Sequence, residues 1–157
     1  MQEDSLSWDE ESTMDARYLN VDLVLHSDSD LSALAEYLEG KVFFLSKEFK
    51  EDGSSILLES NLGITSGPEE DLQELVNVIE SMPDSLMCLW FDCSKKVMDI
   101  GFECGSMEGS LDSFIGMKLV QSLARLECAI NIRIYPSAEK PGEEGTINGC
   151  VSSEQAV

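Results

Sequence analysis

The sequence contains one histidine, His26, and histidine is the usual acid, base or metal ligand near neutral pH. It ends a segment of alternating apolar residues, which predicts a position at a strand end on the surface. Nucleophilic catalysis requires a cysteine or serine and a carboxylate to converge on this one imidazole. The GSMEGS stretch at 105–110 lacks the Gly-x-Ser-x-Gly pattern of serine hydrolases. We therefore expect no catalytic residue, and a small enzyme that pairs His26 with a nearby carboxylate is the least favoured hypothesis.

The five cysteines do not form a metal-binding motif, because no two of them have the Cys-x-x-Cys spacing of zinc sites. Most are expected to pack in the core as small apolar residues. Cys88 and Cys93 are expected in one strand, with side chains on opposite faces because their separation is odd. Cys104 and Cys128 stand alone, and Cys150 is expected to be an exposed thiol. An odd number of cysteines, with no apolar signal segment in the first twenty residues, indicates a reducing cytosol.

Two acidic or glycine-rich segments resemble ligand-binding loops and lack the residues that such loops need. Asp28–Asp30 begins like a calcium loop, but Ala33 stands where the loop needs glycine, so helix capping is the preferred interpretation. The glycines at 101, 105 and 109 are surrounded by acids that would repel a phosphate. We expect no metal and no cofactor.

The composition is strongly acidic, with 31 Asp and Glu against 10 Lys and Arg and a formal net charge of −21. This charge excludes direct binding to nucleic acid or to an anionic membrane, where lysine and arginine must contact phosphates. The longest strongly apolar stretch, Leu86–Phe91, is much shorter than a membrane span of roughly 18 residues. A basic protein is the partner class that remains.

The chain divides into three parts by composition. Residues 1–17 form an acidic arm expected to be disordered, residues 18–136 a single α+β domain, and residues 137–157 a flexible tail of small polar residues. The domain itself contains 21 acids and eight bases. Self-repulsion at that charge destabilises the compact state, and a basic partner would compensate for it.

Hydrophobic periodicity predicts the first half of the domain. Alternation over 18–26 predicts a strand, and Leu31, Leu34, Ala35 and Leu38 give the spacing of one helix face, with Ser27 or Asp28 as its cap. Residues 42–49 and 55–61 flank turn-forming residues, which predicts a hairpin.

The second half begins with a helix after Ser66 or Gly67, where Pro68 suits the first helical position and three acids suit the first turn. The apolar run 86–93 predicts a central strand, joined through Ser94–Lys96 to a strand over 98–104. A helix capped by Asp112 or Ser113 follows, with an apolar stripe that Val120 and Ala124 widen. Alternation over 130–135 predicts the last strand, which Pro136 ends.

The predicted order is β-α-β-β-α-β-β-α-β. Its first six elements match the split β-α-β plan of ferredoxin-like domains, in which helices cover one face of a mainly antiparallel sheet. The sequence therefore predicts an α+β fold of this kind.

Four segments of the sequence resemble a bacterial family of small α/β domains of unknown function that is associated with the immunity proteins of polymorphic toxin systems. They read NVDLVL, LSALAEYL, DLQELVNVI and LVQSLARLECAINIRIYP, and the resemblance spans about residues 20–136. It implies a non-enzymatic protein that binds and blocks a cognate toxin, and it implies no catalytic residue.

The leading hypothesis is an immunity-type binding protein that occludes a basic toxin domain, most simply a nuclease. The alternative is an acidic mimic of nucleic acid that inhibits a DNA-binding enzyme, since both functions use negative charge against a basic surface. The expected partner-binding residues are acids that fall off the apolar stripes: Glu69, Glu70, Asp71 and Glu74 on the second helix, with Asp99 and Glu103 on the fifth predicted strand. Oligomeric state is left open.

Overall fold

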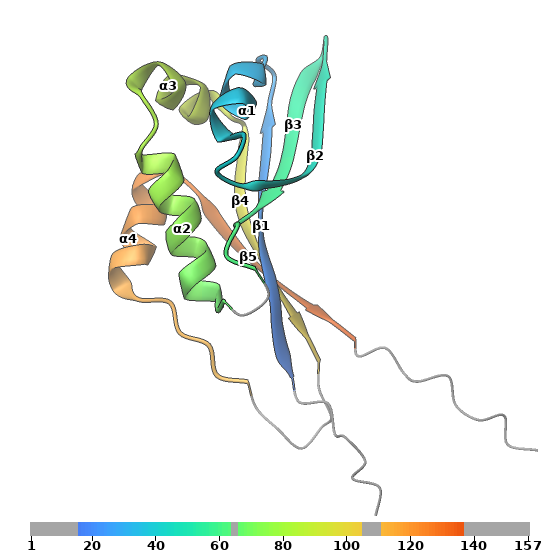
Figure 1. Ribbon diagram of the computed structural model, residues 1–157, viewed down its shortest axis with the longest axis vertical. Coiled ribbons are helices and arrows are strands. Elements are labelled where there is room, and N and C mark those ends of the chain that lie inside the picture. The colour runs from blue at the N-terminus through green and yellow to red at the C-terminus, as the bar shows by residue number, and fades with distance from the viewer. Residues whose placement is uncertain (1–15, 64–65, 105–110, 137–157) are drawn as a thin grey trace, which may run out of the picture.

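The computed structural model describes residues 16–63, 66–104 and 111–136, and these form an α+β fold of four helices and a five-stranded, mostly antiparallel sheet (Figure 1). The predicted tail and the predicted arm lie outside the described residues, apart from Ala16 and Arg17 at the end of the arm. The elements in chain order are β1 (Arg17–Ser27), α1 (Ser32–Leu38), β2 (Phe43–Lys50), β3 (Gly53–Glu59), α2 (Pro68–Glu80), α3 (Asp84–Asp92), β4 (Lys95–Glu103), α4 (Met117–Arg125) and β5 (Ala129–Tyr135).

The strands lie in the order β2-β3-β1-β4-β5, so that β1 is central and β2 and β5 are the two edges. β1 pairs antiparallel with both β3 and β4, and β2 pairs antiparallel with β3 through a tight turn. Gly53 in this turn has φ +143°, and a Cβ there would lie 2.9 Å from the carbonyl oxygen of Ser27. β5 pairs parallel with β4, and α4 supplies the crossover between them.

All helices cover the same face of the sheet, and the other face is open (Figure 1). Alternate residues of β1, namely Val21, Leu23 and Leu25, are buried beneath the helices, as the alternating pattern predicts. The predicted stripe of α1 is buried as well. Its predicted cap is wrong, because Leu31 occupies the N-cap, and the N–H of Ser32 instead donates a hydrogen bond of 2.9 Å to Asp30.

The predicted strand over 86–93 is wrong, since this segment is helix α3, which begins after Pro83. Leu86, Met87 and Trp90 pack toward the core at three- and four-residue spacing, a periodicity that a continuous apolar run conceals. Cys93 is buried and Cys88 is exposed. The predicted hairpin link at 94–96 is also wrong, because β4 already begins at Lys95.

The helix that follows differs from prediction. α4 begins at Met117 with Gly116 as its N-cap, and only Leu119 and Leu123 of the helix are buried. Val120 is exposed, so the stripe is narrower than predicted. The predicted last strand is present as β5, and it is exposed throughout, because it is an edge and none of the described helices covers its isoleucines. Among the described residues, no helix has the length and apolar character needed to cross a membrane.

Candidate partner-binding surface

Three of the six predicted partner-binding acids lie together on α2. Glu69, Glu70 and Glu74 line a shallow groove of about 570 Å³. Its remaining lining residues are Leu62, Gln73 and Asn77, so no lysine, arginine or histidine of the described segments lines it. Its charged lining is therefore entirely acidic.

The amino-acid sequence of α2 explains this presentation. Gly67 is extended at the N-cap and Pro68 starts the helix, as predicted. One side of the helix buries Leu72, Leu75, Val76 and Ile79 against the sheet. The glutamates lie off this buried side, and Glu69 and Glu70 are in the first turn, near the positive end of the helix dipole.

Glu69 is held in place by a contact from another part of the chain. Its Oε1 accepts a hydrogen bond of 3.0 Å from the backbone N–H of Gly116, the N-cap of α4. A Cβ at position 116 would lie 2.7 Å from that oxygen, so a larger residue here would displace the end of the Glu69 side chain. This contact fixes one wall of the groove against α4.

Glu74 has a buried carboxylate oxygen, Oε2, with no hydrogen-bond partner in the described structure. Burial is the main cause that raises the pKa of Glu74 above its ordinary value, the charge of Asp71 adds to it, and a hydrogen bond from the backbone of Asn61 opposes it. A buried acceptor without a donor costs free energy. A lysine or arginine from a partner would bring an opposite charge to this partly buried side chain.

Asp71 contradicts the expectation that all six acids face solvent, because its side chain is buried. Its carboxylate accepts hydrogen bonds from the hydroxyls of Tyr18, Ser60 and Ser66. These donors come from β1, from the end of β3 and from the residues before α2. Asp71 therefore ties α2 to the sheet and is not free to contact a partner.

Asp99 and Glu103 lie on β4, away from the α2 groove, and each already pairs with a base. Asp99 contacts Arg133 at 2.7 Å and accepts a hydrogen bond of 2.9 Å from Asn131. Glu103 pairs with Arg17 at 2.5 Å. The six predicted residues thus do not form one surface.

Sequence reasoning missed a carboxylate cluster on the open face of the sheet. Asp22 lies opposite Glu59 on β3 and opposite Asp99 on β4. The amide of Asn20 donates to both Asp22, at 2.8 Å, and Glu59, at 3.2 Å. Burial, followed by the charges of Glu59 and Asp99, raises the pKa of Asp22 to about 6, although Arg133 opposes the shift. Cross-strand register brings these acids together, and no local pattern reports it.

We expect Asp22→Asn to stabilise the fold by about 1 kcal/mol at neutral pH, after allowing for solvent screening at this half-buried site. The folded pKa of about 6 lies above the ordinary value of 3.8, so the folded protein binds more protons between these pH values. The wild type therefore loses stability as pH rises through this window, and Asp22→Asn does not. Urea unfolding of both proteins at about pH 7 and about pH 4 measures the difference in their free energies of unfolding.

The matched control for this change is Asp28→Asn, which neutralises an exposed aspartate just beyond the same strand. The stability gain of Asp22→Asn over this control should shrink on acidification. A gain that is equal at both pH values contradicts the assignment of the effect to the raised pKa.

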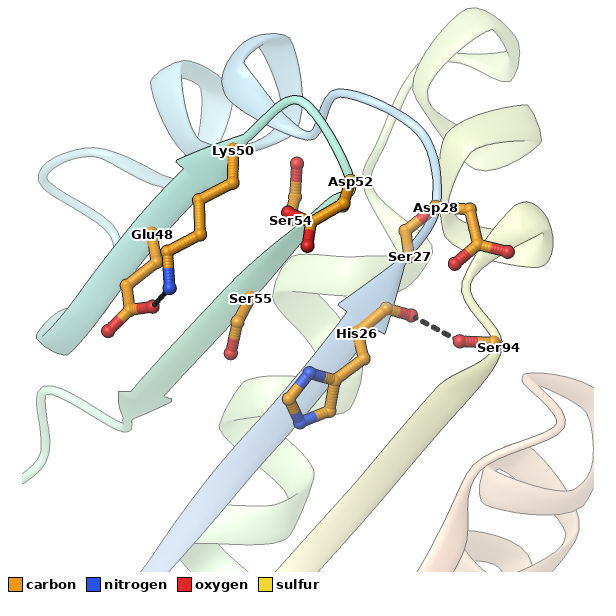
Figure 2. A pocket seen from close by; sticks show the side chains of 10 residues that line it. His26, Ser27, Asp28, Glu48, Lys50, Asp52, Ser54, Ser55 and Ser94 are labelled. Carbon is orange, nitrogen blue, oxygen red and sulfur yellow. Dashed lines mark hydrogen bonds and ion pairs between the residues drawn. The ribbon is translucent and has the colours of Figure 1, made fainter.

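His26 lies at the end of β1 in a separate hollow of about 380 Å³ on the same open face (Figure 2). The hydroxyl of Ser94 donates to the carbonyl oxygen of His26 at 3.2 Å, and Lys50 pairs with Glu48 at 2.7 Å. In Figure 2 the imidazole and the carboxylates of Asp28 and Asp52 point in different directions. Within the described segments no side-chain hydrogen bond reaches the imidazole, so this geometry gives the enzyme hypothesis no support.

The described residues contain no group of three histidine, cysteine or acidic side chains arranged to hold a metal ion. Comparison with protein-family models, with curated proteins and with solved structures found no match to the chain.

Proposed function

We propose that this protein binds a basic protein partner through the α2 groove and blocks it, as an immunity-type inhibitor of a toxin domain. The observation that carries the proposal is the set of three glutamates without a neighbouring base, one of which has a buried, unpartnered oxygen. Such a surface is complementary to a cluster of lysine and arginine side chains.

A nuclease is the class of toxin that fits this surface best. Nuclease active sites hold phosphates and are therefore basic, so an acidic surface competes for the same residues. Complementary charge also raises the rate of encounter, which suits an inhibitor that must capture its target quickly. The mechanism is steric and electrostatic, and it assigns no catalytic residue to this chain.

We infer two finer points along with this function. The first four strands, in the order β2-β3-β1-β4 with antiparallel neighbours, support a ferredoxin-like plan to which α3 and the α4–β5 unit are added. Cys88, Cys93, Cys104 and Cys128 are free thiols, which supports a reducing cytosol as the location.

The test begins with the full-length tagged protein at low salt and identifies the protein that salt elutes from it. We expect replacement of Glu69, Glu70 and Glu74 by lysine to slow association with this partner by about 10- to 100-fold at low salt. The difference should narrow as salt rises, because added ions screen the attraction. Stopped-flow or surface-based association rates over a salt series measure it.

The control variant replaces three exposed acids elsewhere, Asp28, Glu36 and Glu51, by lysine, and so changes the net charge equally. It should slow association much less than the groove variant. Equal slowing by both variants would assign the effect to net charge, and an unchanged rate in the groove variant would remove the α2 groove from the binding site. A partner that is itself a DNA-binding enzyme without toxicity favours the nucleic-acid-mimic alternative.

A further inference from the structure

Within the described residues, strand β5 has a free hydrogen-bonding edge. Among the described strands it pairs only with β4, and the carbonyl oxygen of Tyr135 accepts a bond of 2.7 Å from the N–H of Cys104 on the β4 side. Backbone groups alternate in direction along a strand, so those of Ile130, Ile132 and Ile134 point away from β4. The isoleucines thus present both a donor and an acceptor to any strand that adds at this edge.

The same three residues place apolar side chains on the helix-covered side of the sheet without being covered. Their register partners Met98 and Ile100 are buried, whereas Ile132 is 62% and Ile134 is 67% exposed. Ile132 and Ile134 also line a hollow of about 440 Å³ that includes Phe102 and Leu111. An apolar strand edge beside an apolar hollow is a surface that proteins normally cover.

The segment that contains β5 differs in charge from the other described segments. Residues 111–136 contain three bases and two acids, whereas residues 16–63 and 66–104 together contain six bases and 18 acids. Two copies that meet through this segment therefore repel each other less than two copies that meet through the more acidic segments.

We propose that a second copy of this chain pairs antiparallel with β5 across a two-fold axis at Ile132. The pattern AINIRIY is symmetric about this residue. The axis places Ile132 opposite Ile132 of the second copy and Ile130 opposite Ile134, each pair exchanging both backbone hydrogen bonds. Asn131 then faces Arg133 of the second copy, so no like charges face each other between the two β5 strands. A two-fold axis closes the assembly as a dimer with one continuous sheet.

This inference does not depend on the proposed function, and the two can be tested separately because salt should affect the dimer and the partner complex differently. Higher salt screens the repulsion between acidic copies and leaves the dimer intact or tightens it. The same increase in salt weakens a complex of the α2 groove with a basic partner.

Sedimentation equilibrium of the full-length protein, from about 1 to about 100 µM, tests the dimer. We expect the mass to rise from near 17.3 kDa toward twice that value. Ile132→Lys places two unpaired like charges at the axis and should weaken the dimer at least about 100-fold. The matched control is Leu45→Lys on the opposite edge strand β2, where Leu45 is 45% exposed, and it should leave the dimer unchanged. Circular dichroism confirms that both variants fold.

Disulfide cross-linking tests the register. In a chain with Cys88, Cys104 and Cys150 replaced by serine, Ile132→Cys should form a covalent dimer on mild oxidation. The two Cα atoms of such a pair lie about 5.5 Å apart, within the range of disulfides. Ile130→Cys is the control, because its two copies lie about 13 Å apart along the two β5 strands, and it should stay uncrosslinked.

A protein that is monomeric at every concentration and salt overturns the proposal, as does a dimer that Ile132→Lys leaves intact. If the protein is monomeric and deletion of residues 1–15 speeds hydrogen exchange at the amides of Ile130, Ile132 and Ile134, the acidic arm is the occupant of this edge instead.

Discussion

Trp90→Ala is expected to lower the free energy of unfolding by about 3–5 kcal/mol, the usual cost of truncating a large buried aromatic side chain. Trp90 is fully buried on α3. Its indole N–H donates a hydrogen bond of 3.0 Å to the carbonyl oxygen of Leu126, which ends α4. The substitution therefore leaves both a cavity and an unpaired buried carbonyl. Urea unfolding followed by far-UV circular dichroism measures the loss.

Phe91→Ala is the matched control, since Phe91 is adjacent and 43% exposed. It should lower the free energy of unfolding by less than about 1 kcal/mol. Trp90→Phe removes the hydrogen bond while filling most of the volume, and about 1–2 kcal/mol is expected. Equal losses of stability in Trp90→Ala and Phe91→Ala would contradict the packing described for α3. In a central strand buried on both faces the two residues would be equivalent.

The second large effect is expected at Asp71, where replacement by alanine should lower the free energy of unfolding by about 3 kcal/mol. The buried carboxylate accepts hydrogen bonds from Tyr18, Ser60 and Ser66, and all three hydroxyls lose their acceptor together. Burial, and next the bond to Asp71, raises the pKa of Tyr18 above its ordinary value, which shows how closely the two groups are coupled. Thermal and urea unfolding of the full-length variant measure the cost.

Glu70→Ala is the control at the neighbouring position, because Glu70 is exposed. It should change stability by no more than about 0.5 kcal/mol, although in the proposed function it slows partner binding. The two acids thus separate stability from recognition on one turn of α2. An Asp71→Ala variant as stable as Glu70→Ala would contradict the assignment of Asp71 as the residue that ties α2 to the sheet.

The α2 groove was largely predictable because its signals are local. Pro68 and the acids that follow it specify a helix start, and the apolar spacing from Leu72 to Ile79 specifies which side is buried. Asp71 was misplaced because it borders that stripe. Its burial depends on hydroxyls that β1 and the end of β3 supply, and residues 11 and 53 positions away in the chain are invisible to a local pattern.

The carboxylate cluster around Asp22 was not predictable for a related reason. Each acid occupies an ordinary outward position in its own strand. The raised pKa of Asp22 arises only when β3 and β4 both pair with β1 in one particular register. Strand order is a long-range property, and many orders are compatible with the same alternating segments.

The sequence by itself determined the acidic character of the protein, the existence of β1, α1, the β2–β3 hairpin and α2, and the apolar faces of β1, α1 and α2. Hydrophobic periodicity and turn residues act between near neighbours in the chain, so a local pattern reports them. Only the tertiary structure decided that residues 84–92 are a helix, that Asp71 is buried and that the isoleucines of β5 are uncovered. A continuous apolar run satisfies a helix and a strand equally well. Whether an apolar residue becomes buried depends on which element packs over it, and that is set by contacts between distant parts of the chain.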